Sequence, residues 1–155
     1  MNEFRAWFDG SCGPCNPGGT AASGAIVKDE EGTVLLAERR LVGTGKGMSN
    51  NVAEYGAIIR VFEHLASQPT GHVIVHGDSI LVINQLNGFW RIGDGLYRSA
   101  ALEARGQLER LRGIGWQVEL QWIPRTQNEE CDALSKGPLA GDGDLRQIQP
   151  SSIPI

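Results

Sequence analysis

The stretch at residues 49–75, SNNVAEYGAIIRVFEHLASQPTGHVIV, contains the change of hydrophobic pattern that decides the fold. In its first two thirds, apolar side chains recur every three or four residues, which is the period of an amphipathic helix. These side chains are Val52, Tyr55, Ile58, Ile59, Phe62, Leu65 and Ala66. Pro69-Thr70-Gly71 ends the helix, and the β-branched run at residues 72–75 predicts a short buried strand. The stretch therefore predicts a helix that leads into a strand of a sheet.

Before this helix and strand, the sequence pattern is typical of β-strands. Residues 4–8, 20–28 and 33–41 are each predicted to form a strand, and the sequence Asp29-Glu30-Glu31-Gly32 is a turn signal between the last two. With this turn, the three strands are expected to form an antiparallel meander.

Downstream, the pattern predicts two further helices, one strand and a closing helix. Trp116, Val118, Leu120 and Trp122 alternate strictly with polar residues, which is typical of a strand with one covered face. The helices are expected at residues 79–86, 96–111 and 126–136, with a glycine-punctuated loop at 87–95. The order β-β-β-α-β-α-α-β-α predicts an α/β fold with a mixed five-stranded sheet. In it an antiparallel meander is joined by two parallel strands and flanked by helices.

Length and composition set limits on the function. A chain of 155 residues fits one domain, here residues 1–136, followed by a Gly- and Pro-rich tail at 137–155, docked or disordered. With 14 basic and 18 acidic residues the net charge is −4, which argues against binding nucleic acid by bulk electrostatics alone. No stretch is apolar enough for a membrane span and no signal region opens the chain, so a cytoplasmic protein is expected. The protein is also expected to be a monomer and not to bind a membrane.

Four acidic residues stand where acids are not expected on solvated surfaces. Asp9 directly follows an aromatic strand, and Asp78 follows the buried strand at the edge where ligands bind in α/β sheets. Glu54 lies in the first turns of the long helix, and Asp132 lies inside the closing helix. Carboxylates that converge repel one another unless a cation neutralises them, and such hard oxygen ligands suit Mg²⁺ or Mn²⁺. Two such ions can clamp the attacking and leaving oxygens of a phosphodiester.

Each of these acids also has a purely structural interpretation. Glu54 stands three residues after Asn51, which is the spacing of a capping box. Asp78 is placed to cap the next helix. Asp132 is compatible with an exposed helix position. The sequence does not show that the four side chains converge.

Four sequence blocks nevertheless resemble the signature blocks of type 1 ribonuclease H, in the same order and over about residues 4–136. The blocks are Asp9-Gly10-Ser11 with Asn16-Pro17-Gly18-Gly19, residues 49–55, Gly77-Asp78-Ser79, and residues 122–125 with 128–134. The resemblance implies a two-metal endonuclease that cuts the RNA strand of RNA–DNA hybrids and leaves 3′-hydroxyl and 5′-phosphate ends.

The resemblance also implies roles for individual residues. Asp9 would bridge two Mg²⁺ or Mn²⁺ ions, Glu54 and Asp78 would hold the ion near the leaving group, and Asp132 would hold the ion that carries the attacking water. Further residues match substrate-binding positions. Asn50 and Asn51 match a pair that contacts RNA 2′-hydroxyls, and Asn16 and Ser49 match positions that grip a phosphate of the DNA strand.

The chain departs from the best-studied bacterial members in three places. Its first block is one residue longer, at Cys12-Gly13-Pro14-Cys15. The loop before Asp132 has no histidine, so Arg125 and Glu129 are candidates for an assisting role, while all three histidines are expected to be structural or solvated. The loop at 87–97 has no basic protrusion and only Arg91, although Trp90 is a candidate for stacking on sugar or base. The chain therefore resembles the protrusion-less branch found in archaea and some bacteria.

Two other functions fit parts of the sequence. Cys12 and Cys15 spell the CGPC motif of thiol–disulfide proteins, but Asn16-Pro17-Gly18-Gly19 cannot continue the helix on which that chemistry depends. A reversible disulfide that rigidifies the loop is the more plausible use of this pair. Alternatively, the same fold serves DNA-cleaving and non-catalytic nucleic-acid-binding domains. The complete set of four acids argues against the non-catalytic alternative.

Overall fold

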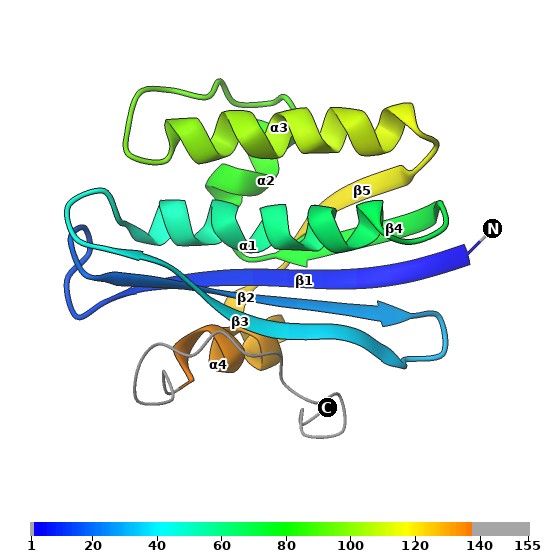
Figure 1. Ribbon diagram of the computed structural model, residues 1–155, viewed down its shortest axis with the longest axis horizontal. Coiled ribbons are helices and arrows are strands. Elements are labelled where there is room, and N and C mark those ends of the chain that lie inside the picture. The colour runs from blue at the N-terminus through cyan, green and yellow to red at the C-terminus, as the bar shows by residue number, and fades with distance from the viewer. Residues whose placement is uncertain (1, 138–155) are drawn as a thin grey trace.

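The computed structural model describes residues 2–137 (Figure 1). The strands are β1 (Asn2–Gly13), β2 (Thr20–Asp29), β3 (Val34–Thr44), β4 (Gly71–Gly77) and β5 (Gln117–Trp122). The helices are α1 (Asn50–Ala66), α2 (Ile80–Leu86), α3 (Arg98–Gly113) and α4 (Glu129–Lys136), with a 3-10 turn at Arg125–Gln127. The expected tail lies outside the described residues, apart from Gly137. No helix in the described range is long and apolar enough to cross a membrane.

The five strands form one sheet in the order β3-β2-β1-β4-β5. β1, β2 and β3 pair antiparallel, and β4 joins β1 in parallel, with Ala6 opposite Val75. β5 then pairs in parallel with β4. The long helix α1 connects β3 to β4, as a crossover between strands that are not neighbours requires. The predicted mixed sheet, with its meander and two parallel strands, is confirmed.

Helices cover both faces of the sheet (Figure 1). α1, α2 and α3 lie on one face over the main core, where Phe8, Tyr55 and Phe62 are fully buried. α4 lies alone on the opposite face and closes a smaller core with Ile26 and Leu134. β2 is buried on both faces between these layers, which explains its nearly continuous run of small and apolar residues.

The alternating pattern predicted for the last strand is confirmed with one exception. Val118 and Leu120 are buried, and the polar residues between them are exposed. Trp122 was expected on the covered face, but 45% of it is exposed. Its indole nitrogen donates a hydrogen bond to the backbone oxygen of Asp78 (3.1 Å), so this ring borders the end of β4 instead of filling the core.

The first strand is longer than its aromatic run predicts. β1 continues to Gly13 because the residues after Asp9 keep pairing with β2, down to Gly13 opposite Thr20. Asp9 therefore lies inside a strand and not at its end, and Cys12 belongs to the strand and not to a loop. Pairing with Gly24 of β2 fixes the backbone of Asp9, which a loop position would not do.

Two of the three histidines, His72 and His76, have structural contacts, as expected. His72 contacts Glu3 and Glu119 across three neighbouring strands. The His76 ring stacks on Trp7, with ring centroids 5.1 Å apart, and its Nδ1 lies 3.0 Å from the backbone oxygen of Ala6. Neither contact involves the four acids singled out in the sequence.

Candidate active site

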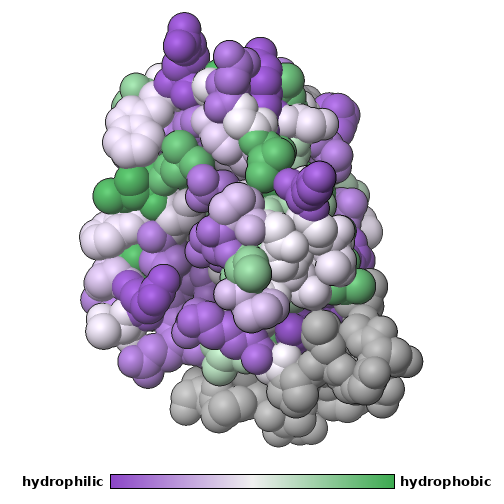
Figure 2. All heavy atoms as spheres, turned by 90° about the vertical axis from the view of Figure 1, so that its left-hand side faces the viewer, coloured by the Kyte–Doolittle hydropathy of each residue, from purple (hydrophilic) through white to green (hydrophobic). Residues whose placement is uncertain are grey.

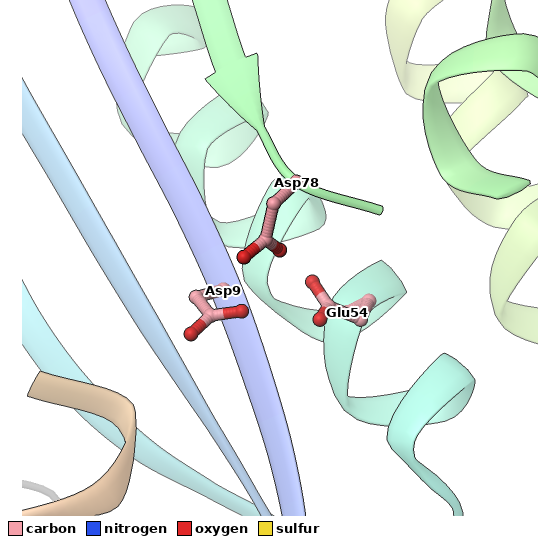
Figure 3. Close-up of side chains that lie close together, drawn as sticks. All are labelled: Asp9, Glu54 and Asp78. Atoms are coloured by element: carbon pink, nitrogen blue, oxygen red, sulfur yellow. The ribbon is translucent and has the colours of Figure 1, made fainter. Parts of the chain in front are cut away.

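Three acids from distant parts of the chain meet at one edge of the sheet. Asp9 of β1, Glu54 of α1 and Asp78, directly after β4, each offer a carboxylate oxygen, and these oxygens lie within 4.8 Å of one another (Figure 3). The parallel pairing of β1 with β4 brings Asp9 and Asp78 to the same end. α1 packs against β1 and places Glu54 beside them. The convergence that the sequence could not show is present for these three.

The structural interpretations of Glu54 and Asp78 are wrong, because serines cap both helices. Ser49 Oγ accepts a hydrogen bond from the backbone nitrogen of Val52 (3.2 Å) and caps α1. Ser79 Oγ accepts from Val82 in the same way and caps α2. Each cap lies one or two residues away from the position that the alternative needs. Both carboxylates are thus free for another role.

Gly10 allows β1 to pass close to α1 at this point. A Cβ atom on Gly10 would lie 2.3 Å from the backbone nitrogen of Glu54 and 2.7 Å from the Cβ of Ala53. Both are far shorter than any van der Waals contact, and one of them is to backbone, which cannot move aside. The absence of a side chain at Gly10 therefore sets the separation between Asp9 and Glu54.

Gly10→Ala is consequently expected to destabilise the protein by about 3 kcal/mol, the upper range for overpacking. By shifting α1 against β1, it should also lower hybrid cleavage by about 100-fold. Urea denaturation and kcat/KM on a labelled hybrid measure the two effects. Gly13→Ala, on the same strand, is the control because its Cβ would meet nothing within 4 Å. Equal stability of the two variants would contradict the packing argument.

In two of the three carboxylates, one buried oxygen lacks a hydrogen-bond donor within residues 2–137. Glu54 Oε2 and Asp78 Oδ2 are buried and accept no hydrogen bond from the described residues. The nearest cationic group to Asp78 is Arg125, whose Nε lies 3.7 Å from Oδ2. Two buried oxygens without hydrogen-bond donors, next to the carboxylate of Asp9, have the chemistry of a site for a hard divalent cation.

The pKa values of all three carboxyl groups are raised, as expected for a group of acids that lacks a neutralising cation. Burial, a hydrogen bond with Asp132 and the charge of Asp78 raise the pKa of Asp9 to about 7. Burial and the neighbouring Asp9 raise the pKa of Glu54 well above its usual range. Burial also raises the pKa of Asp78, although Arg125 opposes the shift. Without a cation, burial and mutual repulsion favour the protonated forms of these carboxyl groups, and Asp9 keeps its proton up to a pH of about 7.

Asp132 lies next to the three acids but is held differently. It is in the first turn of α4, outside the group of three, and one quarter of its side chain is exposed. Partial burial would raise its pKa, but the hydrogen bond with Asp9 and the ammonium of Lys136, 3.1 Å away, keep the pKa below its usual value. Asp132 is therefore charged where Asp9 is protonated, and it is not a freely solvated helix residue.

Two residues of this neighbourhood escaped the sequence reasoning. Lys136 pairs with Asp132 across one turn of α4. Ser135 donates to Asp9 Oδ2 at 3.5 Å and is fully buried. Ser135 and Lys136 stand three and four residues after Asp132, so on a helix they lie on the same face as Asp132. This spacing could have predicted their contacts with the site.

The proposed substrate-binding residues gather at the start of α1. The Asn16 side-chain oxygen accepts a hydrogen bond from the backbone nitrogen of Asn50 (2.9 Å), so the lengthened loop still reaches this helix. Asn50 and Asn51 are exposed in the first turn, directly after the capping Ser49. The extra loop residue therefore does not separate Asn16 from the others.

The remaining candidates differ in their surroundings. Arg125 approaches Asp78, whereas Glu129 is exposed and contacts none of the four acids within the described range. Trp90 is 46% exposed, so it does not cover the core.

The two cysteines of the CGPC motif are free. Cys12 Sγ contacts the backbone oxygen of Cys15 (3.2 Å), and Cys15 is exposed. Cys12 lies in β1, and among residues 2–137 no helix begins before Asn50. The helix N-terminus that activates such a thiol is therefore missing.

Comparison with known proteins gives a consistent result. A family model described as Reverse transcriptase-like matches residues 7–137. The ribonuclease HI of Halobacterium salinarum is 34% identical over 138 residues, which cover 88% of this chain and 64% of that protein. This chain thus spans about two thirds of that relative's length. The ribonuclease H of Paracoccus denitrificans is 32% identical over 155 residues and is covered to 94%.

Solved structures match over nearly the whole described chain. RNase H1 from Halobacterium salinarum NRC-1 superposes with a TM-score of 0.75 at 30% identity, covering 90% of this chain and 98% of that one. LC11-RNase H1, solved in complex with an RNA/DNA hybrid, has a TM-score of 0.75 at 25% identity, covering 89% and 97%. Fold, family model and curated relatives agree, and the chain belongs to the type 1 ribonuclease H family.

Proposed function

We propose that this chain is a metal-dependent endonuclease that hydrolyses the RNA strand of RNA–DNA hybrids. The observation that carries the proposal is the group formed by Asp9, Glu54 and Asp78, with oxygens within 4.8 Å and two buried atoms without donors. Family membership adds to it, since the similar LC11-RNase H1 has been solved with an RNA/DNA hybrid.

The residues fit a pair of divalent cations, Mg²⁺ or Mn²⁺. Asp9, Glu54 and Asp78 would hold one ion, and Asp9 with Asp132 would hold the other. When bound, such ions stabilise the charge on the attacking and leaving oxygens of a phosphodiester. Arg125 and Lys136, which pair with Asp78 and Asp132, reduce the repulsion among the carboxylates in the absence of metal.

The proposed reaction is hydrolysis of a phosphodiester in the RNA strand, in which the attacking water loses a proton and the departing 3′-oxygen gains one. A water oxygen bonds to phosphorus, the bond from phosphorus to the 3′-oxygen breaks, and the products carry a 5′-phosphate and a 3′-hydroxyl. Asn50 and Asn51 would contact 2′-hydroxyls of the RNA strand, which supplies the discrimination against DNA. Asn16 and Ser49 would hold a phosphate of the DNA strand. We further propose that the protein acts as a monomer in the cytoplasm.

Cleavage of three labelled duplexes tests the proposal. RNA–DNA hybrid, DNA duplex and RNA duplex of one sequence are incubated with Mg²⁺, with Mn²⁺ and with chelator. We expect cleavage of the RNA strand of the hybrid with either metal, none of the DNA duplex, and none with chelator. Cleavage of the DNA duplex at the same rate would favour a DNA-cleaving member of the fold. Undiminished cleavage in chelator would refute the metal site.

A further inference from the structure

A large groove lies away from the carboxylates, between α3 and the segment that connects it to α2. Its volume is about 780 Å³. We call it the α3 groove, and its basic and aromatic lining residues are Trp90, Arg91, Arg98, Arg105 and Arg112. Asp94 and Glu109 also line it, so the groove carries a net positive charge although the whole chain carries −4.

The spacing of the arginines explains why they share one groove. Arg98, Arg105 and Arg112 follow one another at intervals of seven residues, close to two helical turns, and so lie along one face of α3. Arg91 joins them from the connecting segment. Considered alone, that segment has a single basic residue, and the positive surface is visible only when it is combined with the helix.

These four cations are not used in ion pairs. Within residues 2–137, none of the four arginines forms a salt bridge with an acid. Arg98 donates a hydrogen bond to the backbone oxygen of Ile92 (2.9 Å), and Arg112 donates one to that of Val118 (2.8 Å). These hydrogen bonds fix the two side chains against the groove walls but neutralise neither charge. The side chains of Arg91 and Arg105 are exposed.

The groove is tied to the helix that carries Glu54. Gln85 is 4% exposed, and its Oε1 accepts a hydrogen bond from the Tyr55 hydroxyl (2.6 Å). Its amide nitrogen donates to the backbone oxygen of Arg91 (3.0 Å) and to the Tyr97 hydroxyl (3.1 Å). A buried polar network of this kind fixes the position of the connecting segment relative to α1.

The surface at the height of α3 includes many hydrophilic side chains (Figure 2). Figure 2 faces the end of the molecule toward which β1 runs, and hydrophilic side chains gather at its top, at the height of α3 in Figure 1. Trp90, at 46% exposure, adds an aromatic ring to the cationic lining.

We propose that the α3 groove binds the phosphate backbone of a nucleic acid strand that continues from the carboxylate site. The inference rests on the proposed function for the identity of that strand. Unpaired guanidinium groups match phosphates, and an exposed aromatic ring offers a stacking surface for a base or sugar. Successive arginines on α3 are about 10 Å apart at 1.5 Å per residue, so the groove follows an extended charged polymer better than a single small anion.

The test compares two double variants of equal charge. The first combines Arg91→Gln with Arg105→Gln. It removes the two groove cations whose side chains make no hydrogen bond to the backbone of the groove walls in the described part of the chain. Arg5→Gln with Arg110→Gln removes two exposed cations outside the groove. Both are made in a non-cleaving Asp78→Asn background, and anisotropy of a labelled RNA–DNA hybrid is measured over a salt series.

We expect the groove variant to bind the hybrid about tenfold more weakly and to lower the slope of log affinity against log salt by about 2, because each lost phosphate contact removes about 0.9. The control should change by less than about twofold, since distant charges are screened. Equal losses in the two variants, or no loss in the groove variant, would overturn the inference. So would arginine-dependent binding of a labelled polyglutamate peptide in place of the hybrid, because the groove would then fit an acidic protein segment.

Cleavage by the active chain separates this inference from the proposed function. A protein that binds the hybrid through the groove but cleaves no substrate with either metal refutes the hydrolysis and keeps the groove. A groove variant that retains the full kcat/KM of the parent at moderate salt refutes the groove and keeps the hydrolysis.

Discussion

Asp9→Asn should lower hybrid cleavage by at least about 10³-fold, a loss of roughly 4 kcal/mol in transition-state stabilisation. Asp9 is 3% exposed, and one of its carboxylate oxygens lies within 4.8 Å of an oxygen of Glu54 and of Asp78. It also shares a hydrogen bond with Asp132. An amide of the same shape keeps the packing but removes the charge that would hold divalent cations. Single-turnover cleavage of a labelled hybrid in Mg²⁺ measures the loss.

Two further variants control this experiment. Asp78→Asn should give a loss of the same order, because its carboxylate belongs to the same group. Glu103→Gln removes an exposed carboxylate on α3, outside the site, and should cleave like the parent. Circular dichroism confirms that each variant is folded. An Asp9→Asn protein as active as the Glu103→Gln protein would refute the assignment of the site.

The same substitution should stabilise the metal-free protein at alkaline pH. Because the folded state raises the pKa of Asp9 from 3.8 to about 7, it holds this proton more tightly than the unfolded chain does. The stability of the metal-free protein therefore falls as the pH rises from about 4 to about 7. Removing the charge should raise the free energy of unfolding at pH 8 by about 2 to 4 kcal/mol, at 1.36 kcal/mol per pKa unit.

Urea denaturation in chelator at pH 8 and pH 4 measures this effect. The advantage of Asp9→Asn should be large at pH 8 and vanish at pH 4, where Asp9 is protonated in the folded parent. Added Mg²⁺ should stabilise the parent more than the variant, because the ligand binds only the folded state. An Asp9→Asn protein less stable than the parent at pH 8 would show that the carboxylate has a partner that compensates its burial.

Hydrophobic period predicted most of the fold. The stripe from Val52 to Leu65 gave α1, and the alternation of Val118 and Leu120 gave β5, because both patterns are local and both elements bury one face. The extension of β1 beyond Asp9 could not be predicted in this way. Residues 10–13 are small or polar, and only their pairing with β2 makes them a strand.

The site depended on contacts that no local pattern contains. The approach of Asp9 to Glu54 requires the absent side chain of Gly10, and the approach of Asp9 to Asp78 requires β1 beside β4. The family resemblance supplied the four acids, but their separation comes from packing. The arginines of α3 were missed for a similar reason, since a seven-residue spacing on a helix has meaning only once the opposite wall of the groove is known.

The central position of β1 makes the molecule suited to division into two fragments. β1 pairs with β2 on one side and with β4 on the other. Gly47, in the turn between β3 and α1, is exposed. A break there leaves Asp9 on one fragment and Glu54, Asp78 and Asp132 on the other. Neither fragment holds a complete set of acids, so the arrangement is a template for a split reporter whose signal depends on reassembly of the sheet.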